Sequence, residues 1–183
     1  IVLTPHIAAS TKEAQRDAAI IVADEIIELT KGNNPKNVLN MPRIDNNTYQ
    51  ELSPYMELCE KLGSFISQAV NGKLKEIEII YSGELAEIAN LEILSRTVIQ
   101  GAVNPFLSSP VNAVNASLVA KERGISITEG RKDYAKGYES LIKVIAKSET
   151  DTFSAEGTHL HDARILKVNG YWVDVIPKGH MFI

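Results

Sequence analysis

The chain has 183 residues, of which 44% are hydrophobic and 23% are charged, and its formal net charge is −4. These values are typical of a globular protein with one full domain plus a remnant, or with two small domains. With this net charge, the chain has no excess of Lys and Arg that would indicate binding to nucleic acid phosphates. No apolar run is long enough to cross a bilayer. The single cysteine, Cys59, cannot form an internal disulfide, so a reducing, cytoplasmic compartment is expected.

Both ends of the sequence are apolar. The chain opens on an apolar run at residues 1–3 and closes on another at 180–183. Because the termini of native domains are usually polar, we expect neighbouring domains on both sides of this chain. Alternatively, the two apolar runs pair with each other in a single compact domain.

The first predicted element is a helix. Ser10 and Glu13 have the spacing of a capping box, which marks a helix start, and Gly32 is a typical helix end. Two apolar stripes between them indicate burial on more than one side, as for a helix wedged between domains or subunits. Residues 33–50 contain two prolines and six asparagines, which predicts an irregular crossing segment at the domain boundary.

Three further helices and a strand are predicted in the middle of the chain. Ser53 and Pro54 predict the N-cap and first position of a helix that keeps its apolar period up to Gly72. A strand is expected over residues 77–81 and a long helix over 85–103, ended by the Asn-Pro pair at 104–105. Asn112 is expected to cap another helix, which reaches residue 123 and stops at Gly124.

The rest of the chain has the pattern of β-strands. They are predicted over residues 125–128, 139–146, 152–158, 164–168 and 171–176. Asn169 and Gly170 predict a type I′ hairpin turn, because both residue types tolerate positive φ angles. Together the elements predict an α+β fold, with helices packed on one face of a largely antiparallel sheet.

Catalytic signatures are few. The sequence contains no glycine-rich phosphate loop, no Cys-x-x-Cys pair and no His-Glu-x-x-His motif. His6 lies between a predicted strand and a capped helix, a position suited to a cleft in an α/β sheet. A histidine that only satisfies a backbone carbonyl in such a turn is the more common arrangement, and the local sequence alone favours it.

Two other groups of side chains could form a site. His159 and His161 could share a metal with Glu156 or Asp162, but the spacing fixes no further ligand, and no metal is predicted. Basic residues late in the chain could form an anion pocket, or a charged, solvated sheet edge that discourages aggregation. These basic residues are Arg131, Lys132, Lys136, Arg164, Lys167 and Lys178.

Residues 3–15, with the sequence Leu-Thr-Pro-His-Ile-Ala-Ala-Ser-Thr-Lys-Glu-Ala-Gln, resemble the catalytic-histidine loop of D-3-phosphoglycerate dehydrogenases. An ordered series of shorter motifs is similar to the long form of this family, which has an extra domain between its catalytic core and a C-terminal ACT domain. The motifs are Ser53-Pro54-Tyr55, Lys61-Leu62-Gly63, Gly83-Glu84, Pro110-Val111-Asn112, Val114-Asn115-Ala116, Glu122-Arg123-Gly124, Gly157-Thr158, and Asn169-Gly170 with Asp174. Their order and approximate spacing match over essentially the whole chain.

The resemblance implies a domain organisation. Residues 1–31 would be the last strand and helix of a Rossmann-type nucleotide-binding domain, and residues 32–50 would cross the edge of the substrate domain. Residues 51–177 would form the allosteric substrate-binding domain, and residues 178–183 would begin an ACT domain. The main NAD-binding domain and the rest of the ACT domain would lie outside this chain.

The resemblance also implies an activity. The parent enzyme would oxidise the phosphorylated substrate 3-phospho-D-glycerate to 3-phosphohydroxypyruvate with NAD, in L-serine biosynthesis. His6 would be the general base that accepts the proton of the substrate hydroxyl, and Ala8 and Ala9 are candidate cofactor contacts. We expect a homo-oligomer, either a dimer or a tetramer. This chain alone is expected to be inactive and to serve mainly as the regulatory domain.

The sequence departs from the family pattern at two places. Ala8 stands where the family commonly has glycine, so a hinge role there loses its support. Arg164 occupies a position where relatives often carry a basic residue thought to bind a regulatory anion, but the second such position is Ile176. Lys178 and Lys132 are the other candidate anion ligands.

Three alternatives to a dehydrogenase fragment remain. The chain could be a stand-alone module that senses an anion, or a structural module for oligomerisation. It could also be the related domain of an L-serine dehydratase. The last alternative is disfavoured because a single cysteine cannot hold an iron–sulfur cluster.

Overall fold

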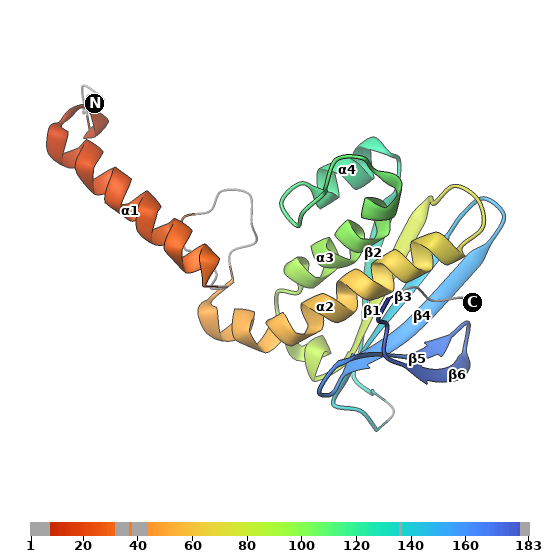
Figure 1. Cartoon of the computed structure of the whole chain (residues 1–183). Helices are drawn as coiled ribbons and strands as arrows, with labels where there is room; N and C mark the ends of the chain where they lie inside the picture. Colours follow the sequence, from red (N-terminus) through yellow and green to blue (C-terminus); the bar gives the residue numbers. More distant parts are fainter. Residues whose placement is uncertain (1–7, 32–36, 38–43, 136, 180–183) are drawn as a thin grey trace, which may run out of the picture. The chain divides into compact units, whose positions relative to one another are not determined.

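The computed structural model describes residues 8–31, 37, 44–135 and 137–179. The chain divides into two compact units, the first formed by residues 1–39 and 43–49 and the second by residues 40–42 and 50–183. The helices are η1 (Ala8–Ser10), α1 (Lys12–Thr30), α2 (Asn46–Ala69), η2 (Glu84–Glu87), α3 (Glu92–Val103), η3 (Asn104–Phe106) and α4 (Ala116–Glu122). The strands are β1 (Glu76–Gly83), β2 (Ser126–Lys132), β3 (Ser140–Lys147), β4 (Thr152–His159), β5 (Ala163–Val168) and β6 (Tyr171–Val175) (Figure 1).

Helix α1 starts one residue later than predicted. The N-cap is Thr11, whose side-chain oxygen accepts a hydrogen bond from the Ala14 amide at 3.1 Å, whereas Ser10 belongs to the preceding η1. No residue of α1 is buried, and apolar residues of both stripes, such as Ile20 and Val22, are exposed. Burial of this helix on two sides therefore stays a prediction. No helix in the described part of the chain is long and apolar enough to cross a membrane.

Helix α2 begins at Asn46, and the predicted start at Ser53 and Pro54 is wrong. The actual cap is Asp45, whose carboxylate accepts hydrogen bonds from the backbone amides of residues 47 and 48, each at 3.0 Å. Pro54 lies inside the helix and cannot donate to the Gln50 carbonyl one turn earlier. The Ser53 hydroxyl donates to that carbonyl instead, at 3.0 Å, so the helix continues through the proline without an unpaired oxygen.

The strands form one six-stranded sheet in the order β2-β1-β3-β4-β5-β6. Only the β1–β2 pair is parallel, so the prediction of a largely antiparallel sheet is confirmed. The five predicted strands from residue 125 onward match β2 to β6, although β2 extends further, to Lys132. Asn169 and Gly170 have φ angles of 47° and 86°, as the predicted hairpin turn requires.

Helices α2, α3 and α4 lie on one face of the sheet, as predicted (Figure 1). Alternate residues of β1 point toward them, among them Tyr81, whose buried hydroxyl shares a 2.8 Å hydrogen bond with Ser95 of α3. On β4, a Cβ added at Gly157 would touch Leu58 of α2. The main core therefore lies between this face and the helices, with Leu58, Leu62, Ile77, Ile79, Leu94, Ile142 and Ile165 fully buried in it.

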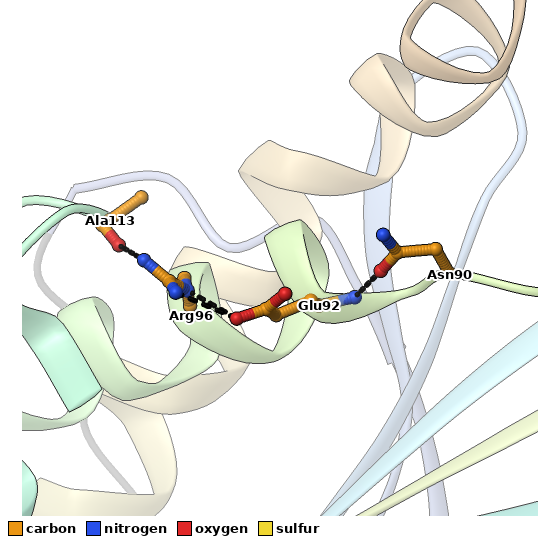
Figure 2. Close-up of polar contacts among 4 residues, drawn as sticks. All are labelled: Asn90, Glu92, Arg96 and Ala113. Carbon is orange, nitrogen blue, oxygen red and sulfur yellow. Dashed lines mark hydrogen bonds and ion pairs between the residues drawn. The ribbon is translucent and has the colours of Figure 1, made fainter. Parts of the chain in front are cut away.

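The predicted long helix over 85–103 is in fact two elements, η2 and α3, with an extended link between them. The Asn90 side chain accepts a 3.0 Å hydrogen bond from the Glu92 amide, which starts α3 at that residue (Figure 2). The Arg131 guanidinium donates to the carbonyls of residues 86, 88 and 89 at 2.6–3.0 Å and so holds the link against β2. Periodicity alone could not reveal this interruption, because its cause is an arginine forty residues away.

Helix α4 also starts later than predicted. Asn112 does not cap it directly but accepts hydrogen bonds from the amides of residues 114 and 115, forming a turn before the helix. The predicted end at Gly124 is confirmed, with a φ of 71° and bonds from residues 124 and 125 back into the last turn. Arg96 of α3 donates to the Ala113 carbonyl at 3.2 Å and to Glu92 at 2.6 Å, which joins the two helices through this turn (Figure 2).

Helices α2 and α3 cross in backbone contact. A Cβ added at Gly63 would collide with the Val98 carbonyl oxygen, and one at Gly101 would collide with the Glu60 carbonyl oxygen. Each glycine thus faces the backbone of the other helix, and neither carbonyl can move aside without distorting its helix. The two glycines are required by this close approach, and neither has a positive φ.

We expect Gly63→Ala to destabilise the domain by about 3 kcal/mol, since the added methyl group must push two packed helices apart. The free energy of unfolding from urea denaturation measures the effect. Gly130→Ala is the matched control, because a Cβ there would lie 3.6 Å from the nearest side-chain atom, an ordinary contact. A Gly63→Ala variant as stable as the Gly130→Ala variant would contradict the close crossing.

Candidate anion-binding site

The β5–β6 hairpin brings one of the predicted anion ligands beside a carboxylate. Arg164, near the start of β5, donates from Nε to Asp174 Oδ1 at 2.8 Å. The register shifts between residues 165 and 167, and Asp174 has a φ of 47°, so an irregular hairpin end aims this side chain. The hydrogen bond that Arg164 donates to the Asp174 carboxylate raises the pKa of the guanidinium above its ordinary value.

Lys178 belongs to the same neighbourhood. Its Nζ lies 3.4 Å from Asp162 Oδ1, and Asp162 also attracts Arg164 electrostatically. We call Arg164, Lys178, Asp162 and Asp174 the charge quartet. The formal charges of its two cations and two anions sum to zero. Because each cation is paired with an aspartate, an incoming anion has to compete with the two carboxylates. Within the described residues, however, the terminal nitrogens of the Arg164 guanidinium make no hydrogen bond and can face a ligand oxygen.

The other basic residues do not join the quartet. Lys132 lies on β2, four inter-strand steps from β5, which is about 19 Å at the usual strand spacing. Arg131 is bonded to backbone carbonyls, and Lys136 lies outside the described residues. Lys167 pairs with Glu156 at 3.4 Å and lies over the Trp172 ring, with only 14% of its side chain exposed. Of the three predicted anion ligands, the structure therefore brings together Arg164 and Lys178.

The two described histidines have different surroundings. His159 packs edge-on against Tyr55 of α2, with ring centroids 5.9 Å apart, whereas His161 lies in the exposed turn before β5. Among the described residues, no three His, Cys, Asp or Glu side chains are grouped as a metal site would need. His6 and His180 lie outside the described residues. Of the candidate cofactor contacts, Ala8 starts η1 and Ala9 is exposed within it.

Two glutamates, Glu84 and Glu139, form an acidic corner that was not predicted from the sequence. Glu84 follows β1 and Glu139 precedes β3, and the register that pairs residue 83 with residue 140 places them side by side. The Glu84 amide donates to the Glu139 carbonyl at 3.0 Å. The negative charge of Glu139, the largest influence, raises the pKa of the Glu84 carboxyl, with smaller contributions from Glu87 and Glu51. Only strand pairing unites Glu84 and Glu139, so no local sequence signal could have found this pair.

Several comparisons with known proteins agree on one family. A family model described as the D-3-phosphoglycerate dehydrogenase intervening domain matches residues 51–169. The chain is 38% identical to the D-3-phosphoglycerate dehydrogenase of Archaeoglobus fulgidus and 39% identical to that of Methanocaldococcus jannaschii, in each case over the whole chain and 35% of the relative. The Bacillus subtilis protein of the same name is 33% identical over 99% of the chain. The chain thus spans about a third of the length of these relatives.

The acidic corner predicts a pH-dependent stability. A carboxyl whose pKa is raised in the folded state makes that state less stable above its folded pKa, and the penalty disappears as the pH falls. We expect Glu139→Gln to raise the melting temperature at about pH 8 and to lose this advantage at about pH 3, where carboxyl groups are largely protonated.

Glu57→Gln, an exposed substitution on α2, is the matched control for the loss of one negative charge. NMR titration of the Glu84 side chain should show its pKa fall in the Glu139→Gln variant. An unchanged Glu84 pKa, or an equal gain at both pH values, would contradict the proposed repulsion.

Proposed function

Since the chain belongs to the D-3-phosphoglycerate dehydrogenase family, we propose that it supplies the intervening, regulatory domain of an NAD-dependent enzyme. The reaction would be the oxidation of 3-phospho-D-glycerate to 3-phosphohydroxypyruvate, in L-serine biosynthesis. The observation that carries this proposal is the family match over residues 51–169, together with whole-chain relatives of the same name. We expect the full-length protein to be a homo-oligomer, with residues 1–31 contributed by its nucleotide-binding domain.

His6 is the proposed general base. Bound NAD would supply the hydride acceptor for the carbon that carries the hydroxyl, and His6 would take the hydroxyl proton as the carbonyl forms. A histidine suits this role because its pKa lies near neutral pH. Ala8 and Ala9 can offer only backbone groups to the cofactor, so the main NAD-binding residues are proposed to lie elsewhere in the full-length protein.

In the full-length enzyme, we expect His6→Ala to lower kcat by about two to four orders of magnitude, the usual contribution of a positioned general base. The Kd for NAD should change little, because the histidine acts on the substrate. His161→Ala is the matched control, since His161 lies in an exposed turn of the intervening domain. Steady-state kinetics with an unchanged kcat for His6→Ala would remove this residue from the mechanism.

The regulatory role is proposed to rest on anion binding at the charge quartet. Arg164 can use its two terminal nitrogens for two oxygens of a phosphate, and Lys178 adds a second positive charge. Asp174 and Asp162 oppose this binding because each holds one of the two cations. The competition supports a weak site that responds to high concentrations of a phosphorylated metabolite, such as the substrate.

Removing the competing carboxylate should therefore strengthen the site. We expect calorimetry with 3-phosphoglycerate to show tighter binding by Asp174→Asn and about tenfold weaker binding by Arg164→Ala, the effect of losing a charged hydrogen bond. Lys132→Ala is the control, because this lysine lies on the far strand β2. An absence of binding heat in every variant would favour the alternative of a purely structural, oligomerising module.

A further inference from the structure

A cavity of about 480 Å³ lies where the C-terminal ends of α2, α3 and α4 meet. Its size is within the range of sites for small molecules. The apolar part of its lining comes from both helices and loops: Ala102 and Val103 are buried, and Leu74 and Ile125 are half-buried. All of its lining residues belong to the second unit, and none belongs to the charge quartet.

The rim of the cavity combines positive charge with an exposed aromatic ring. Lys73 and Arg123 line it, and neither forms an ion pair with any of the described residues. Lys73 only contributes a minor attraction that lowers the pKa of Glu149. Glu122 is the one acidic lining residue, so the lining side chains carry a net positive formal charge, which has to outweigh the partial negative charge of the helix C-termini. Phe106 completes the rim and is 57% exposed, a large apolar surface that a bound ligand could cover.

The segments that form the rim are held in place by hydrogen bonds. The loop that carries Lys73 is tied down by Asn71, whose amide donates to Asp151 at 3.0 Å and whose carbonyl accepts from the Ser148 hydroxyl at 2.5 Å. Before Phe106, the Asn104 side chain exchanges two hydrogen bonds with the Val111 backbone, at 2.8 and 3.0 Å. A cavity with fixed walls loses little conformational entropy when a ligand enters, which favours binding.

The end of α4 does not need the Arg123 side chain as a cap. The last-turn carbonyls of residues 119, 120 and 121 already accept hydrogen bonds from the amides of residues 123, 125 and 124. The guanidinium is therefore not required by these backbone oxygens. It keeps its planar set of donors for a carboxylate or a phosphate.

We propose that this cavity binds a small organic anion, with its apolar body between Phe106 and the buried lining and its acidic group at Lys73 and Arg123. An inorganic anion would leave the apolar lining in contact with water, and an organic cation would be repelled by the rim. A neutral apolar molecule would gain nothing from the two cations. The site is separate from the charge quartet, so its ligand can differ from the phosphorylated substrate.

The test uses the 183-residue chain and a set of four probes matched in shape or charge. They are 3-phenylpropionate, its neutral amide, 3-phenylpropylamine and inorganic phosphate, each titrated while backbone amide shifts are followed by NMR. We expect the carboxylate to shift amides in residues 67–74, 102–106 and 122–125, with at least about tenfold tighter binding than the amide, as for a charged hydrogen bond gained. The amine and inorganic phosphate should leave these amides unchanged.

Variants locate the two halves of the site. Arg123→Gln should weaken 3-phenylpropionate binding by about tenfold through the lost charged hydrogen bond. Phe106→Ala should weaken it by about the same factor through the lost apolar contact. Lys121→Gln removes a neighbouring charge of α4, and Leu118→Ala removes a side chain as exposed as Phe106, at 59%. Neither residue lines the cavity, so these controls should bind as the unchanged chain does.

Three results would overturn the proposal. The first is equal affinity for the carboxylate and its amide, and the second is a set of shifted amides confined to residues 160–178, which would place the anion at the charge quartet. The third is an absence of shifts at a probe concentration of about 10 mM, beyond the range of useful small-molecule affinity. The comparison among probes is made on the unchanged chain, so it remains decisive even where a variant fails to fold.

Discussion

The backbone contact between α2 and α3 at Gly63 and Gly101 is the constraint on which the arrangement of the second unit depends. It lets two helices lie close enough together to cover one face of the sheet. On one side of the crossing Leu58 of α2 reaches Gly157 of β4, and on the other Ser95 of α3 binds the Tyr81 hydroxyl of β1. A larger residue at either glycine would separate the helices and expose this core.

The same crossing also sets the position of the proposed organic-anion site. Beyond the glycines, Ser67 of α2 and Ala102 of α3 both reach the cavity at the helix ends.

The two proposed anion sites differ in their electrostatics. At the charge quartet each cation is held by an aspartate, so binding an anion requires an exchange of partners. At the cavity the rim cations have no such partner among the described residues, but the apolar lining restricts which anions fit.

Local signals in the sequence predicted the elements that depend only on neighbouring residues. The hairpin at Asn169 and Gly170, the break at 104–105 and the end of α4 at Gly124 belong to this kind, because each rests on the φ angles of glycine and asparagine or on a proline. The start at Ser53 failed because a hydroxyl can replace the proline's missing donor as well as it can cap a helix. The long helix over 85–103 failed because Arg131, distant in the sequence, stabilises the non-helical link.

The candidate sites likewise combine features that neighbouring residues predict with features that depend on distant parts of the chain. The hairpin that carries Arg164 and Asp174 could be anticipated from its turn at residues 169–170. An unshifted register would set Asp174 opposite Ile165, however, so the ion pair with Arg164 depends on the register shift between residues 165 and 167. The distance of Lys132 from Arg164 could not be anticipated either, since the parallel crossover that places β2 at the far edge leaves no local trace in the sequence. The acidic corner and the cavity also join residues from distant segments, and only the folded structure reveals them.

We propose that this chain is part of a dehydrogenase whose chemistry requires further residues. The most direct test is an assay of NADH formation from 3-phospho-D-glycerate, made side by side on the 183-residue chain and on the full-length protein. We expect turnover by the full-length protein alone. Turnover by the isolated chain, or none by the full-length protein with substrate and NAD in excess, would contradict it.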